Sequence, residues 1–247
     1  MDNTEKFDGK GELYARARPG YAPELFDHIK HSLPEGSVFA DIGSGTGIFT
    51  RQLLNCGCRV YAVEPNGDMR KKAEEALSGH KNFVSVDGTD RSTTLPPQSV
   101  DCVTAAQAFH WFDPDLFRRE CRRILKPHGS VILVYNTRDE TTGCTAALAD
   151  IHRRYCPEFQ GFSNGISEET CREFFGGDCE VFRADNSQSY DRQGFIARAL
   201  SSSYSLREGD REYAEYLARL HQLFDMFSRS GALVVPMHTV AYIGCFN

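Results

Sequence analysis

A glycine-rich turn that joins an apolar run directly to a helical pattern constrains this chain more than any other feature. The run 38–42 is followed by Gly43, Ser44, Gly45 and Gly47. Glycines let a ligand approach the backbone at the carboxyl end of a strand, and the N–H groups at the start of the next helix bind its polar or anionic ends. The spacing is Gly-x-Gly-x-Gly, whereas dinucleotide-binding turns have Gly-x-Gly-x-x-Gly. Asp41, just before the turn, suits an ammonium group better than a pyrophosphate.

Short apolar runs alternate with helical patterns over the first 135 residues. The pattern at 115–125 has an apolar stripe at helical spacing, and we expect Asp113 before Pro114 to cap that helix. Such alternation is typical of an α/β fold, a parallel sheet with helices on both faces. The expected strands are 38–42, 59–63, 83–86, 100–105 and 130–135, and the expected helices include 23–33, 66–77 and 115–125.

The regular alternation of apolar runs and helical patterns ends after residue 135. Residues 140–175 are expected to be mostly helical, 180–183 to form a strand and 239–245 to form a final strand. A long amphipathic stripe (Tyr213, Leu217, Leu220, Phe224 and Phe227) predicts another helix. This half is interpreted as sheet completion with a helical elaboration rather than a separate domain.

Composition excludes several classes of protein. The chain has 247 residues, with Lys+Arg 28 and Asp+Glu 34, so that 28 − 34 = −6, which makes nucleic acid an unexpected partner. No secretory signal and no apolar run of membrane-spanning length is visible, and the nine cysteines are expected to be free thiols in a cytoplasmic protein. Cys56 and Cys58 lack a second Cys/His pair at finger spacing, so no metal site is expected.

Glu64 is the second element of the ligand site. It ends the expected second strand, 17 residues after Gly47, where a carboxylate can accept hydrogen bonds from both hydroxyls of a ribose. Pro65 follows it directly.

Asp41-Ile-Gly-Ser-Gly-Thr-Gly47 followed by Val-Glu64-Pro-Asn resembles the signature of class I S-adenosylmethionine-dependent methyltransferases. Leu125-Lys-Pro-His128-Gly is also similar to that family's Leu-Lys-Pro-Gly-Gly. The resemblance implies a Rossmann-like sheet of seven mostly parallel strands with the last strand antiparallel, and S-adenosylmethionine as cofactor. It also implies one methyltransferase domain over 1–247, divided into an N-terminal cap segment (1–35), a cofactor-binding core (36–135), a substrate-side elaboration (136–236) and a final strand (237–247).

A finer resemblance comes from the stretch Gln107-Ala-Phe-His110-Trp111-Phe112, together with Tyr14-Ala-Arg-Ala-Arg18-Pro and Ser-Ser-Ser-Tyr204. These motifs are similar to the small-molecule branch that includes trans-aconitate methyltransferase-like proteins. The resemblance implies that His110 and Tyr14 serve catalysis and that Trp111, Phe112 and Tyr204 bind the acceptor. Aromatic faces favour a methylsulfonium cation, although aromatics after a strand equally suit a core.

Cofactor-binding residues are expected around the turn, at Gln107, at Arg18 and on the adenine side. Arg18 suits a carboxylate of the cofactor or the substrate. The adenine side departs from the family pattern, because Thr89 and Asp90 are followed by Arg91 where many relatives have Glu. Met69 suits packing on adenine, although a core methionine is an equal alternative.

Four arginines, at 118, 119, 122 and 123, share one face of the expected helix 115–125 and offer a surface for RNA. Such a stripe is more often a solvated helix face, and the net charge of −6 favours that explanation. The leading hypothesis is methyl transfer to a small-molecule acceptor (a carboxylate, hydroxyl or amine) by a monomer or weak dimer. The alternatives are methyl transfer to RNA or protein, a non-catalytic S-adenosylmethionine-binding module, and a nicotinamide-dependent dehydrogenase.

Overall fold

The computed structural model describes residues 20–138, 140, 143–162 and 166–246. Its main sheet has seven strands in the order β3-β2-β1-β4-β5-β9-β6, and β9 runs antiparallel to both β5 and β6. The predicted fold, including the antiparallel last strand, is confirmed. The strands are β1 Val38–Ile42, β2 Arg59–Val63, β3 Phe83–Val86, β4 Val100–Ala106, β5 Leu125–Thr137, β6 Glu180–Asp185 and β9 His238–Gly244.

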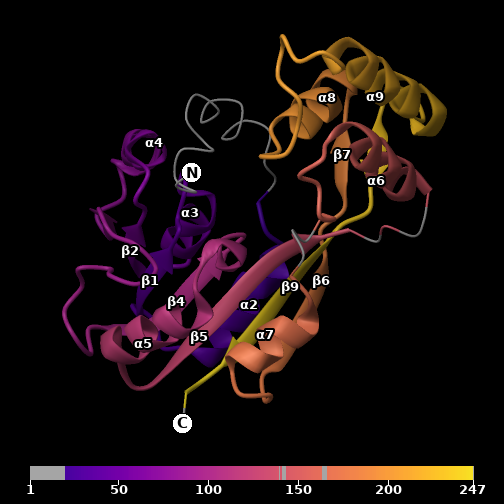
Figure 1. Cartoon of the computed structure of the whole chain (residues 1–247). Coiled ribbons are helices and arrows are strands. Elements are labelled where there is room, and N and C mark those ends of the chain that lie inside the picture. The colour runs from indigo at the N-terminus through magenta and orange to yellow at the C-terminus, as the bar shows by residue number, and fades with distance from the viewer. Residues whose placement is uncertain (1–19, 139, 141–142, 163–165, 247) are drawn as a thin grey trace.

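Helices cover both faces of this sheet (Figure 1). On one face, α2 (Pro23–Ser32), α3 (Ile48–Asn55) and α4 (Gly67–Leu77) contribute Leu25, Leu53 and Leu77 to an apolar cluster under the sheet. On the other face, α5 (Pro114–Ile124) and α7 (Glu168–Phe174) bury Phe117 and Phe174 against the strands. Because helices cover both faces, β1 and β4 are almost entirely buried and most of their residues are apolar.

Local capping fixes where the helices begin. The Asp113 carboxylate accepts hydrogen bonds from the N–H groups of Asp115 and Leu116 at 3.0 Å each, which confirms the predicted cap of α5. Asn66 caps α4 by accepting from the N–H of Met69 at 2.9 Å. The element therefore begins at Gly67, one residue later than predicted.

A smaller layer, which we call the cap lobe, lies at the end of the sheet where β5 leaves it (Figure 1). It consists of α6 (Gly143–Tyr155), α8 (Arg192–Leu200), α9 (Tyr213–Phe227) and a two-stranded sheet of β7 (Gln188–Tyr190) and β8 (Leu233–Val235). The cap lobe has its own apolar cluster, which includes Phe195, Tyr216 and Phe224. The segment 136–236 therefore supplies the cap lobe and also α7 and β6 of the main layers.

Candidate functional site

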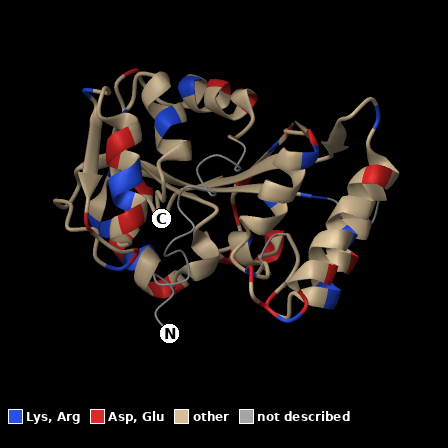
Figure 2. Cartoon of the chain, turned by 90° about the horizontal axis from the view of Figure 1, so that it is seen from above, with Lys and Arg blue, Asp and Glu red and all other residues tan. Residues whose placement is uncertain are grey.

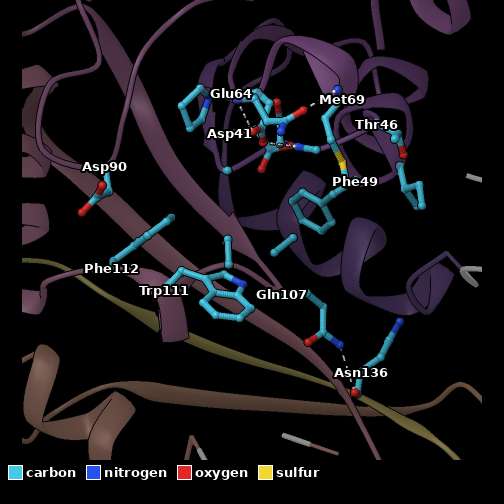
Figure 3. A pocket seen from close by; sticks show the side chains of 18 of the residues that line it. Asp41, Thr46, Phe49, Glu64, Met69, Asp90, Gln107, Trp111, Phe112 and Asn136 are labelled. Carbon is cyan, nitrogen blue, oxygen red and sulfur yellow. Dashed lines mark hydrogen bonds between the residues drawn. The ribbon is translucent and has the colours of Figure 1, made fainter. Parts of the chain in front are cut away.

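A cavity of about 440 Å³ opens at the carboxyl ends of β1, β2 and β4, within the roughly 300–1,000 Å³ typical of ligand pockets. Figure 3 shows Asp41, Glu64 and Met69 at one end, Trp111 nearer the middle and Asn136 at the other end. Most residues predicted for the site lie in its lining: Asp41, Gly43, Ser44, Gly45, Glu64, Pro65, Met69, Thr89, Asp90, Gln107, Trp111 and Phe112.

The three glycines of the turn serve different purposes, although all have positive φ angles (+69°, +57° and +81°). A Cβ on Gly43 would lie 2.8 Å from Cβ of Ala108, so this glycine lets the β4 exit pack on the turn. A Cβ on Gly47 would lie 2.7 Å from Cδ1 of Leu77, so this glycine lets α4 approach α3, and Gly47 does not line the cavity. Gly45 lines the cavity with open space at its Cβ position, since nothing is nearer to that position than the Met69 sulfur at 3.7 Å.

Asp41 is a buried carboxylate at the floor of the cavity. It accepts hydrogen bonds from the hydroxyls of Thr50 at 2.6 Å and Thr104 at 2.8 Å. Burial raises the pKa of Asp41 to about 6, although these two hydrogen bonds oppose the rise. A cationic group in the cavity would favour the ionised carboxylate.

Glu64 holds the turn together before any ligand arrives. One of its oxygens accepts from the N–H of Gly45 at 2.8 Å, and the other accepts from the N–H of Asn66 at 2.8 Å. Burial raises the pKa of Glu64, and the two backbone hydrogen bonds oppose that rise. Each carboxylate oxygen retains a further lone pair, so Glu64 can also accept from two hydroxyls of a ligand.

The adenine side is built from the loop after β3. Thr89 and Asp90 line the cavity as predicted, and exposed Arg91 lines it beside them. Burial raises the pKa of the Asp90 carboxyl, while the charge of Arg91 lowers it. Met69 is 4% exposed and contacts the cavity, so it serves the core and the site together.

The aromatic loop after β4 forms the middle of the site. Gln107 has a φ of +53°, and its amide nitrogen donates to the backbone oxygen of Asn136 at 3.1 Å. A short 3-10 helix, η2 (Phe109–Trp111), then presents Trp111 to the cavity, and Phe112 follows. His110 instead packs on Trp111, with ring centroids 4.7 Å apart, and on Tyr135 at 6.2 Å.

His110 and Tyr204, expected to serve catalysis and acceptor binding, are absent from the described lining of the cavity. Tyr204 packs in the cap lobe against His152 and Phe159, with ring centroids 5.1 and 4.9 Å apart, and is partly buried there against the apolar cluster. Tyr14 and Arg18 lie outside the described residues.

Sequence reasoning missed part of the lining. Thr46 and Asn66 lie inside the two motifs of the methyltransferase signature, and Tyr21 follows the motif 14–19 closely, so these motifs could have identified all three residues. Others carry no local motif and reach the cavity only through the tertiary fold. This second group includes Asn136, Arg198 and Met237, from β5, α8 and the segment before β9.

The arginine stripe of α5 is occupied by contacts within the fold. Arg118 donates to the backbone oxygen of Phe174 at 2.8 Å, Arg123 pairs with Glu120 at 2.7 Å, and Arg122 lies 5.4 Å from the ring centroid of Phe246. Over the described residues, Lys and Arg alternate with Asp and Glu along the helices in Figure 2. The stripe is therefore a structural feature of α5.

No helix in the described part of the chain is long and apolar enough to cross a membrane. No group of three His, Cys, Asp or Glu side chains in the same residues is arranged to hold a metal ion.

Part of the chain is similar to known methyltransferases. Residues 40–133 match the family model described as a methyltransferase domain. An uncharacterized methyltransferase of Mycobacterium tuberculosis is 40% identical over 151 residues, which cover 61% of this chain and 60% of the relative. An uncharacterized methyltransferase-like protein of Schizosaccharomyces pombe is 33% identical over 155 residues, or 60% of this chain and 58% of the relative. The matches thus span about 60% of the length of these relatives.

Solved structures support the fold. A putative type II methyltransferase of Anaeromyxobacter dehalogenans has a TM-score of 0.68 at 23% identity and covers 92% of this chain and 97% of its own. A putative methyltransferase from an antibiotic biosynthesis pathway of Anabaena variabilis has a TM-score of 0.65 at 21% identity, with 93% and 99% covered. S-adenosylmethionine is the methyl donor of the matched family. Residues 40–133 therefore match a methyltransferase domain, and the chain has the fold of these solved structures.

Proposed function

We propose that this chain transfers a methyl group from S-adenosylmethionine to a small-molecule acceptor, a carboxylate, hydroxyl or amine. The observation that carries the proposal is the cavity at the β1–β2 edge, where the open face of Gly45 lies beside the carboxylates of Asp41 and Glu64. A strained glycine without a Cβ leaves the space that a ligand needs against the backbone, and the two carboxylates match an ammonium and a ribose.

The residues of the cavity have complementary tasks in this proposal. Glu64 accepts from the ribose hydroxyls, Asp41 attracts the ammonium group, and Thr89, Asp90 and Met69 form the adenine side. S-adenosylmethionine supplies a methyl group that is already electrophilic, so this chain's work is alignment and exclusion of water. Trp111 and Phe112 give a dry aromatic wall beside the transfer, and aligned reactants gain up to roughly 7–11 kcal/mol over free ones.

The acceptor side favours a small molecule over a macromolecule. The cap lobe reaches the cavity through Arg198, and Met237 lines it just before β9, so residues from both halves of the chain line one cavity. The finer resemblance to the trans-aconitate methyltransferase-like branch supports the same acceptor class. Two arginines of the α5 stripe already form contacts within the fold, Arg118 with Phe174 and Arg123 with Glu120, which weakens the case for an RNA acceptor on that helix.

Methyl transfer itself is the test. Purified protein is incubated with methyl-labelled S-adenosylmethionine and a panel of small carboxylates, phenols and amines, and release of S-adenosylhomocysteine is measured. We expect binding of S-adenosylmethionine and turnover of at least one acceptor class, both lost in Gly45→Val, because valine fills the open face of the turn. Binding of NAD in preference to S-adenosylmethionine would refute the proposal and revive the dehydrogenase. Tight cofactor binding with no transfer to the panel or to cell extract would support the non-catalytic module instead.

A further inference from the structure

The turn on the adenine side of the cavity is closed by its own backbone. Thr89 and Ser92 exchange two backbone hydrogen bonds, at 2.9 and 3.3 Å, so Asp90 and Arg91 form the tip of a tight turn. We call residues 89–92 the adenine turn, because Thr89, Asp90 and Arg91 line the cavity. Since the turn is a compact unit, the position of its base decides where the Asp90 carboxylate lies.

Thr93, directly after the adenine turn, is fully buried and bonded to one side chain of α5. Its N–H and its hydroxyl both donate to Oε1 of Glu120, at 2.7 and 2.5 Å. The other end of the turn packs on the same residue, because a Cβ on Gly88 would lie 2.9 Å from the Thr93 backbone oxygen. The two ends of the adenine turn therefore meet at Thr93, and Glu120 holds that residue.

Arg123 fixes the Glu120 carboxylate in its turn. Its Nε donates to Oε2 of Glu120 and its Nη2 to Oε1, each at 2.7 Å, which is a bidentate pair with a defined geometry. Nη1 of Arg123 donates to the backbone oxygen of Leu95 at 2.8 Å, so the pair also holds the chain that follows Thr93. Although burial acts to raise it, the pKa of Glu120 is lowered by the hydrogen bonds from Arg123 and Thr93, so this carboxylate is ionised at neutral pH.

A buried ion pair is a weak source of stability, because the cost of removing two charges from water offsets much of their attraction. Such a pair can instead fix one arrangement of the groups around it. Apolar residues at 120 and 123 would leave the buried N–H of Thr93 without its acceptor. We propose that Glu120 and Arg123 are positioning residues, which hold the adenine turn so that Asp90 recognises the amino group of the cofactor's adenine. The inference rests on the adenine role that the proposed function gives to Asp90.

The base of the ligand separates this positioning from a general loss of structure. S-inosylhomocysteine presents a carbonyl oxygen where S-adenosylhomocysteine presents the adenine amino group, so it places an acceptor against the Asp90 carboxylate. Calorimetry measures both affinities, and we expect the wild type to prefer the adenine compound by about tenfold or more. Glu120→Ala should reduce this preference to about threefold or less, mainly by weakening the binding of S-adenosylhomocysteine.

Two further variants test the contact with Thr93 itself. Glu120→Gln keeps one oxygen as an acceptor and should retain most of the preference for adenine. Thr93→Val keeps the shape of the side chain and removes one of the two hydrogen bonds to Glu120. It should lower the preference by about twofold or more, and it serves as the test if the Glu120→Ala protein does not fold.

Asp115→Ala is the matched control, because Asp115 pairs with Arg118 at 3.0 Å on the same helix, is exposed and lies outside the described lining of the cavity. This variant should keep the wild-type preference. Equal wild-type affinities for the two compounds would overturn the inference, as would a full preference in folded Glu120→Ala and Thr93→Val proteins. An equal loss of affinity for both compounds would also overturn it, because Glu120 would then support the whole site rather than the recognition of adenine. A wild-type protein that binds neither compound would refute the proposed function, and this inference with it.

Discussion

Glu64 combines two roles in one side chain. Its oxygens already accept from the N–H groups of Gly45 and Asn66, so the carboxylate fixes the glycine turn relative to the start of α4. The same oxygens are the acceptors proposed for the ribose. A change at Glu64 therefore acts on the shape of the empty site and on the bound ligand together.

Glu64→Ala should weaken S-adenosylmethionine binding by about tenfold or more, which corresponds to roughly 1.4 kcal/mol or more. The ligand hydroxyls and two backbone donors lose their acceptor, and unpaired polar groups cost more than one lost bond. Calorimetry measures the affinity, and a value within about twofold of wild type would contradict the ribose role. Glu64→Gln, which keeps the shape and one acceptor oxygen, should lose less.

Asp41 makes cofactor affinity depend on pH. Its pKa of about 6 means that the carboxyl is ionised at pH 7 and becomes protonated as the pH falls to 5. An ammonium group binds the ionised form, so affinity should be highest above about pH 6 and fall by up to about tenfold by about pH 5. Calorimetric titrations across this range check the trend. Asp41→Asn should bind more weakly at pH 7 and show a flatter profile, and an unchanged profile would exclude Asp41 as the source.

At the scale of elements, α3 and α4 depend on one missing side chain. Gly47 stands at the start of α3 with a φ of +81°, and its Cβ position is already occupied by Leu77 and Ala73 of α4. The third glycine of the turn thus sets the distance between two helices, while Gly45 keeps the cavity open.

Gly47→Ala should lower the free energy of unfolding by about 1–3 kcal/mol more than Gly57→Ala does. Gly57, with a φ of +84°, has no atom within 4 Å of its Cβ position, so it measures the left-handed strain alone, about 1–2 kcal/mol. Urea unfolding of both variants gives the difference. An equal loss of unfolding free energy in the two variants would mean that Leu77 moves away from the new methyl group without cost.

Sequence patterns predicted the main sheet because each of its strands is marked by one continuous, mostly apolar run of residues. The bounds of β1, β2 and β3 match the predicted ranges, since each is a short apolar run between polar or glycine-rich turns. The sequence did not predict β7 and β8, which are three residues long and more than forty residues apart, so no local pattern marks their pairing. It also placed the start of β5 too late, because Pro127 and Gly129 argue against a strand that nonetheless begins at Leu125.

Across the whole molecule, a buried polar network ties four chain regions together. Asn186, between β6 and β7, donates to the backbone oxygen of Gly20 and to Oδ1 of Asn136, each at 2.9 Å. Thr239 donates to the same Oδ1 at 2.6 Å and accepts from the N–H of Ala22 at 2.9 Å. The network therefore fixes the chain that leads into α2 at the rim of the cavity, where Tyr21 forms part of the lining.

Asn186→Ala should lower the free energy of unfolding by about 1–3 kcal/mol, because it removes a donor shared by Gly20 and Asn136. Urea unfolding measures the loss, with Ser187→Ala, at the exposed next position, as the control. A loss no greater than that of the control would show that the network contributes nothing to stability.

The parts of the site that could be predicted are those whose residues lie next to one another in the sequence. The turn at 43–47, Glu64 and the loop at 107–112 each carry chemistry within a few residues, and the cavity contains most of them. Tyr204 was predicted at the site but packs on the apolar cluster of the cap lobe, because a motif gives no information about which cluster a tyrosine joins. Arg198 was missed for the converse reason, since only the packing of the cap lobe brings it to the cavity.

The insertion of β9 between β5 and β6 sets the order in which this chain can fold during synthesis. Residues 238–244 of β9 pair with both β5 and β6. The edges of β5 and β6 that face β9 therefore have no partner until the ribosome has released β9. Until then the nascent chain presents unpaired strand edges, which is when a chaperone or a neighbouring chain can bind them. Thr239 within β9 also holds the chain before α2, so the earliest and latest parts of the described chain become ordered together. The rim of the cavity is consequently among the last of the described parts to form.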